Sequence, residues 1–137
     1  MMKTRWFAFL SAALFISLPL AFAQRGMRNY NPSTETTVKG TVEEVKQVSG
    51  RRGWNGTHLV LKTEAGQMEV HVGPSSYISG QGFSFAKGDE VEAMGSRVKI
   101  EDSDVLIARE IKKEGKTLTL RNAQGIPQWS GRGRQPQ

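Results

Sequence analysis

The chain contains no cysteine, and this absence limits both its stability and its chemistry. A protein without cysteine forms no disulfide, no zinc–thiolate site and no covalent haem link, and it has no thiol nucleophile. Histidine, which also binds metals and transfers protons, occurs only at His58 and His71. A folded domain within these 137 residues must therefore be held together by its own apolar core.

Catalytic motifs are missing as well. The sequence has no Ser-His-Asp order and no glycine loop of the kind that cradles phosphates. Its neighbouring acidic residues fall on the outward positions of expected strands or in turns, where solvated charge is ordinary. The sequence therefore predicts a protein that is not an enzyme and needs no cofactor.

Residues 1–23 have the pattern of a secretory signal peptide. Lys3 and Arg5 form a basic start, an uncharged apolar stretch follows, and Ala21-Phe22-Ala23 has the spacing of a signal peptidase site. An uncleaved anchor is the alternative, because the apolar stretch approaches the roughly 20 residues of a spanning helix. Pro19 and the cleavage-type spacing favour removal, so we expect a periplasmic or secreted protein with no membrane span after cleavage.

The positive charge is concentrated near the ends of the chain. The net charge of +6 falls by two, to +4, when residues 1–23 are removed with Lys3 and Arg5. Residues 35–121 hold 13 basic and 13 acidic residues, so the expected folded part is neutral. A nucleic-acid-binding domain normally carries basic residues on its folded surface, and this distribution argues against such a partner.

An alternation of apolar and polar residues dominates the middle of the sequence and predicts β-strands. We expect a disordered linker at residues 24–36, a barrel at 37–122, and an extension at 123–137 that is partly docked and then disordered. The alternation slips near Glu43-Glu44 and again near Gly95-Ser96, which predicts two β-bulges.

The order of the expected elements indicates an all-β fold. A bent first strand, a hairpin, a short helical turn after Pro74 and a second hairpin predict a small OB-fold-like barrel of five to six strands. For the first hairpin we expect Thr63 to pair with Met68. His71 then faces Val60, and His58 is its diagonal neighbour on the same outward face.

Three stretches carry a resemblance to a known group of proteins: Gly40–Val45, Gly56–Leu61 and Gly88–Ser96. They are similar to small secreted bacterial OB-fold domains, which include the periplasmic stress-tolerance OB-fold family and uncharacterised relatives. Val70–Pro74 and Leu120–Trp129 resemble the uncharacterised relatives more. The resemblance implies an envelope location and a non-catalytic binding or scaffold role without nucleic acid, and it supplies no catalytic residues.

Two groups of residues are candidate sites. His58, His71 and Glu69 share the outward face of the first hairpin and form a candidate site for Zn²⁺, Cu²⁺ or Ni²⁺. The alternative is that both histidines are simply solvated side chains on a strand. The second group comprises Arg51, Arg52 and Trp54 in the loop at residues 49–56, together with Val60 on the adjoining strand.

In OB-folds, ligands bind between this loop and the face of the second and third strands. Trp54 is interpreted either as a stacking surface for a ligand or as a cap over the barrel mouth. The leading prediction is therefore a binding or scaffold module for an unknown envelope ligand or protein. A weak metal-binding envelope protein is the first alternative, and an oligonucleotide-binding OB domain is the second. Ile126 and Trp129 are expected to pin the extension onto the barrel rather than to serve as a partner-binding motif.

Overall fold

The computed structural model describes residues 30–50 and 53–130 of the chain. The expected signal peptide at residues 1–23 lies outside this part. Within the described part, no helix has the length and apolar character needed to cross a membrane. The elements are, in order, η1 (Pro32–Thr34), β1 (Glu35–Ser49), β2 (Asn55–Thr63), β3 (Gly66–Pro74), α1 (Ser75–Gly80), β4 (Glu90–Ile100), β5 (Ser103–Lys113) and β6 (Lys116–Thr119).

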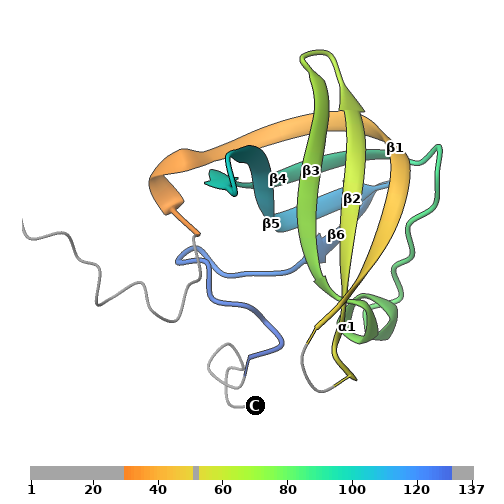
Figure 1. Cartoon of the computed structure of the whole chain (residues 1–137). Helices are drawn as coiled ribbons and strands as arrows, with labels where there is room; N and C mark the ends of the chain where they lie inside the picture. Colours follow the sequence, from red (N-terminus) through yellow and green to blue (C-terminus); the bar gives the residue numbers. More distant parts are fainter. Residues whose placement is uncertain (1–29, 51–52, 131–137) are drawn as a thin grey trace, which may run out of the picture.

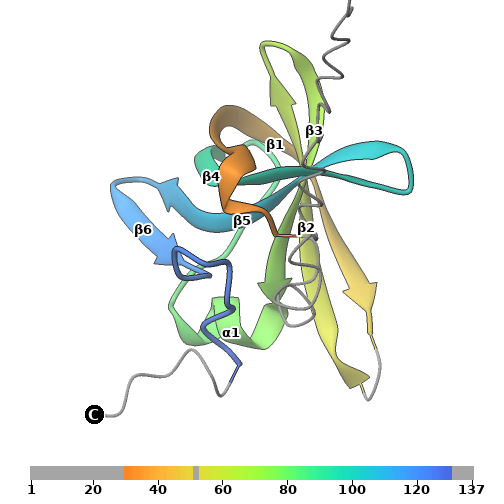
Figure 2. The same ribbon diagram turned by 90° about the vertical axis from the view of Figure 1, so that its left-hand side faces the viewer.

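The strands form one sheet that closes into a barrel. They are ordered β3-β2-β1-β4-β5-β6, and a parallel pairing between β3 and β5 joins the two ends of the first five strands. β6 adds a sixth strand to β5, and α1 lies at one end of the barrel (Figure 1). The β4–β5 hairpin projects from the body of the barrel (Figure 2). This arrangement confirms the predicted all-β barrel of five to six strands with a short helix after the third strand.

β1 is long and strongly curved, and it pairs with two neighbouring strands (Figure 1). Its first half pairs with β4, and from Thr41 onward it pairs with β2. The pairing with β2 shifts between Val42 and Glu44, which makes Glu43 the extra residue of a bulge. The bulge predicted at this position is confirmed, and it gives the strand the bend that closure requires.

A second shift occurs where β4 crosses β5. Met94 pairs with Glu110 and Gly95 pairs with Ala108, so the extra residue is Arg109 on β5. The sequence predicted an irregularity here, but placed it on β4 alone. A Cβ added to Gly95 would lie 2.0 Å from the carbonyl oxygen of Ile107. Glycine is therefore required here by the close approach of the two backbones.

The pairing of β2 with β3 differs from the prediction by two residues. Thr63 pairs with Gly66, rather than with Met68, because Glu64 and Ala65 alone form the turn. His58 consequently lies directly opposite His71, where a diagonal relationship was expected. The shift is an even number of residues, so the same side chains still face inward.

The core fills the barrel with aliphatic side chains from all five barrel strands and from β6. Val42, Leu59, Leu61, Val70 and Leu106 are almost wholly inaccessible to solvent. Each such side chain contributes roughly 1.5–3 kcal/mol through its removal from water. Tyr77, Phe83 and Phe85 pack against this core as partly buried groups.

The ends of the described chain dock on the same barrel. Residues 30–36, which the sequence assigned to a linker, form η1 and the first part of β1. The backbone N–H of Asn31 donates to Oγ of Ser96, and Tyr30 is buried against Gly125. Trp129 packs against the core and over Gly73. The polar composition of residues 30–36 concealed these contacts, because they depend on partners far along the chain.

Candidate metal centre

The two histidines and one glutamate come from neighbouring strands of one hairpin. His58 lies on β2, whereas Glu69 and His71 lie on β3. Leu59 and Val70, which alternate with these residues, are buried inside the barrel, so the three polar side chains point outward. His58 and His71 form a cross-strand pair, and Glu69 precedes His71 by two residues on the same face. The sequence prediction that these three share a face therefore agrees with the structure.

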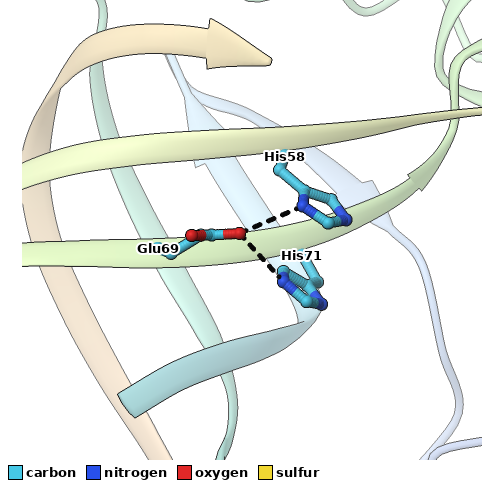
Figure 3. Close-up of side chains that lie close together, drawn as sticks. All are labelled: His58, Glu69 and His71. Atoms are coloured by element: carbon cyan, nitrogen blue, oxygen red, sulfur yellow. Dashed lines mark hydrogen bonds and ion pairs between the residues drawn. The ribbon is translucent and has the colours of Figure 1, made fainter. Parts of the chain in front are cut away.

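The three side chains converge on one carboxylate oxygen (Figure 3). Oε1 of Glu69 accepts from Nδ1 of His58 at 3.1 Å and from Nε2 of His71 at 3.2 Å. The two imidazole rings are stacked, with centroids 3.7 Å apart and planes 13° from parallel. One ligand atom from each residue can be chosen such that all three lie within 4.8 Å of one another.

The surroundings favour neutral imidazoles beside an ionised carboxylate. Burial lowers the pKa of His58, and burial together with the nearby His58 lowers the pKa of His71. Burial alone would raise the pKa of Glu69, but hydrogen bonds from the histidines and the charge of Lys46 lower it. Neutral imidazole and ionised carboxylate are the protonation states that bind a metal ion.

This donor set fits a divalent transition metal. Two imidazole nitrogens and one carboxylate oxygen are ligands of zinc, and the same combination with open positions binds non-haem Fe(II). Without a metal, the nitrogens that face Oε1 must carry protons in order to donate to it. For those nitrogens to bind an ion, their protons must move to the other ring nitrogens or the rings must turn, and the two imidazole side chains are 21% and 24% exposed.

Lys46 is a neighbour of the site that sequence reasoning missed. It lies opposite His58 on β1, and its Nζ is 4.0 Å from Oε2 of Glu69. The pattern of alternation predicts the bulge at Glu43, but it does not set the register of β1 against β2. That register places Lys46 opposite His58 and does not follow from the alternation alone.

The predicted ligand-binding residues do not gather into one cluster in the described part of the chain. Arg51 and Arg52 lie outside the described residues. Val60 is on the outward face of β2, opposite Glu69. Trp54 lies over Gly50 and Gly56 of its own hairpin and is 45% exposed. Its interpretation as a cap over the barrel mouth is therefore wrong, because the indole packs on the backbone of Gly50 and Gly56 and is not part of the barrel core.

Comparison with known proteins identifies the family. The model of the MamS/MamX magnetosome protein family matches residues 34–118, which run from the end of η1 into β6. The chain belongs to this family. It is also 27% identical over 120 residues to the magnetosome protein MamS of Paramagnetospirillum magneticum strain AMB-1. That alignment covers 83% of this chain and 63% of MamS, so the chain spans less than two thirds of that relative's length.

Membership of the MamS/MamX family corrects the resemblance drawn from the sequence. The similarity to the periplasmic stress-tolerance OB-fold family is wrong at the level of family, because a different family model matches the barrel. Gly40–Val45 and Gly88–Ser96 carried that resemblance, and they form a bent strand and a turn leading into a strand. Many small barrels need such segments, so these residues indicate a fold and do not identify a family. The family match includes all three residues of the candidate metal centre.

Proposed function

We propose that this MamS/MamX-family barrel is a non-catalytic binding protein that holds a divalent transition-metal ion at His58, Glu69 and His71. The observation that supports this most directly is the convergence of three different donor groups within 4.8 Å. Both histidines of the chain take part, and Glu69, the acid that both of them contact, supplies the third donor.

The alternative is a purely structural cluster of hydrogen bonds. Such a cluster would use the two neutral rings only as hydrogen-bond donors to Oε1 of Glu69, and protonation of both rings would place like charges in contact at 3.7 Å. A metal ion instead uses the neutral rings and the negative carboxylate together. By the usual order of affinities, Cu²⁺ binds most tightly, with Ni²⁺ and Zn²⁺ following and Fe²⁺ weaker.

The test is a calorimetric titration of Zn²⁺ and Cu²⁺ into the full chain, purified without a polyhistidine tag. We expect one ion per chain for the wild type. His58→Ala and His71→Ala should each weaken binding by at least about tenfold, because even changes beside metal ligands cost about 10- to 100-fold. Glu44→Gln, an exposed acid on β1, is the matched control for Glu69→Gln. Unchanged affinity in both histidine variants, with folding intact by circular dichroism, would overturn the proposal.

A second binding surface is favoured by the exposure of two large apolar side chains. Val48 and Trp54 remain 37% and 45% exposed, and within residues 30–50 and 53–130 they are the large hydrophobic residues that do so. Both lie on the β1–β2 hairpin, next to the positions of Arg51 and Arg52. This supports the leading sequence prediction of a binding or scaffold module for an envelope ligand or protein. A pull-down from envelope extract should lose its specific partner on Trp54→Ala.

We infer further that the protein acts outside the cytoplasm. The signal-peptide pattern of residues 1–23 supports export. The name of its relative, a magnetosome protein, supports a role at that structure. Fusion of the full chain to alkaline phosphatase, which is active only after export, tests the location, and an inactive fusion of normal abundance would contradict it.

A further inference from the structure

Lys46, His58 and His71 form one row across three strands. Lys46 on β1 lies opposite His58 on β2, which lies opposite His71 on β3. The side chain of Lys46 is 41% exposed, and its Nζ is 4.0 Å from Oε2 of Glu69. The two histidines contact the other oxygen of that carboxylate, Oε1. An ammonium group therefore stands beside the ligand set and remains open to solvent.

A metal ion held by these three side chains would be incompletely coordinated. Zinc takes four ligands, and ions that prefer five or six have more positions to fill. The ligand-bearing side chains point away from the barrel core, so the open positions face the outer surface. Water or an anion from solution must complete the shell.

The charge around the site favours an anion over water as the remaining ligand of the metal ion. Without metal, the negative charge of Glu69 balances that of Lys46. A divalent ion bound to Glu69 adds two positive charges to this pair. The ion, Glu69 and Lys46 together then carry a net charge of about +2, counted from the formal charges. Glu44 is the next acid on this outward face and lies in the row of Val60 and Glu69, and counting its charge as well still leaves a formal net charge of about +1. An anion on the metal would restore the balance and give Lys46 a new partner.

We propose that the metal ion at this site binds a small oxyanion, a phosphate or a carboxylate, and that Lys46 holds its outer oxygen. This inference rests on the proposed metal-binding function. It assigns the centre a ligand class and gives Lys46 a role in positioning the anion. No covalent step is involved, since the anion replaces water on the metal.

The experiment uses Co²⁺, whose visible absorption changes when a ligand enters its coordination shell. The full chain is loaded with Co²⁺ in a sulfonate buffer of constant chloride, and phosphate and acetate are titrated in separate arms. We expect a saturable spectral change in the wild type. Lys46→Met should keep the Co²⁺ affinity and weaken oxyanion binding by about fivefold, the effect of losing a partly exposed ion pair. Lys39→Met is the matched control, because it removes another lysine of β1, paired with Glu92 of β4, and it should change neither affinity.

Each result has a distinct meaning. A response to phosphate alone supports a phosphate ligand, and a response to both anions supports the wider oxyanion class. If Co²⁺ binds but its spectrum ignores both anions, this inference is overturned while the metal site stands. Equal anion affinity in Lys46→Met and the wild type overturns the role of Lys46. If Co²⁺ does not bind at all, the proposed function fails and this inference fails with it.

Discussion

The guanidinium of Arg121 lies over the ring of Trp129, 5.0 Å from its centroid. Its Nη1 donates to the carbonyl oxygens of Val72 on β3 and Ala108 on β5. These strands pair directly only as far as His71 and Ile107, so Arg121 joins them just beyond the last pair. Burial lowers the pKa of Arg121 to about 10, which leaves it charged at neutral pH.

Replacement of Arg121 should therefore weaken the closure of the barrel. Arg121→Met removes two hydrogen bonds to carbonyl groups and the contact with Trp129, and we expect a loss of about 2–4 kcal/mol in the free energy of unfolding. Urea denaturation measures this change in the free energy of unfolding. Arg97→Met is the control, since Arg97 forms an exposed pair with Asp104 and should change stability by less than about 1 kcal/mol. Equal effects of the two changes would contradict this role of Arg121.

Gly95 should tolerate no side chain. Gly95→Ala would place a Cβ 2.0 Å from the backbone oxygen of Ile107, and neither strand can retreat without breaking the pairing of β4 with β5. We expect at least about 3 kcal/mol of destabilisation, or failure to fold. Gly80→Ala is the matched control, because no atom lies within 4 Å of its added Cβ, and its stability should be unchanged or slightly higher. Thermal denaturation of both variants, compared with the wild type, measures the difference in stability.

Metal removal should lower the stability of the folded chain. An ion that binds the folded state much more tightly than the unfolded chain adds up to about 2.7 kcal/mol when its free concentration is a hundred times Kd. We expect Zn²⁺ to raise the melting temperature of the wild type and EDTA to reverse the rise. The rise should disappear in His71→Ala and persist in Glu44→Gln. A Zn²⁺ effect of the same size in His71→Ala would show that the ion acts elsewhere.

The turn before β4 should give the protein an acid-sensitive contact. Asp89 accepts hydrogen bonds from Nζ of Lys113 at 2.9 Å and from the N–H of Ala86 at 2.8 Å, and these lower its pKa. A carboxyl whose pKa is lowered by folding stabilises the protein above its unfolded pKa, near 3.9, and loses that contribution as the pH falls through its folded pKa.

The corresponding variant is Asp89→Asn, with melting temperatures measured from pH 7 to pH 2. We expect the wild type to melt at a higher temperature at pH 7 and the two curves to approach each other in acid. A difference that stays constant down to pH 2 would mean that the charge of Asp89 contributes nothing.

The barrel was predictable because its signals are local. The alternation of residues along each strand reports which side chains face inward, and the slip at Glu43 follows from the same pattern. The shared face of His58, Glu69 and His71 required only that alternation and the correct parity of pairing. The sequence left the turn length open, so the direct opposition of His58 and His71 was missed by two residues.

Contacts between residues far apart in the sequence could not be predicted from these local patterns. Lys46 reaches the candidate metal centre through the register of β1 against β2, and Arg121 reaches β3 and β5 only after the barrel has closed. Trp54 illustrates a different difficulty. A tryptophan in a glycine-rich loop is compatible with burial in a small core, but Gly50 and Gly56 provide a flat backbone surface that holds it on the outside.

All three donor groups lie between positions 58 and 71, on a single hairpin with a two-residue turn. Joining such close parts of the chain costs little conformational entropy, whereas the parallel contact of β3 with β5 must gather residues more than thirty positions apart. The ion could thus be captured while the polypeptide is still emerging or partly folded. Metal uptake would then accompany the maturation of the chain instead of waiting for the finished barrel.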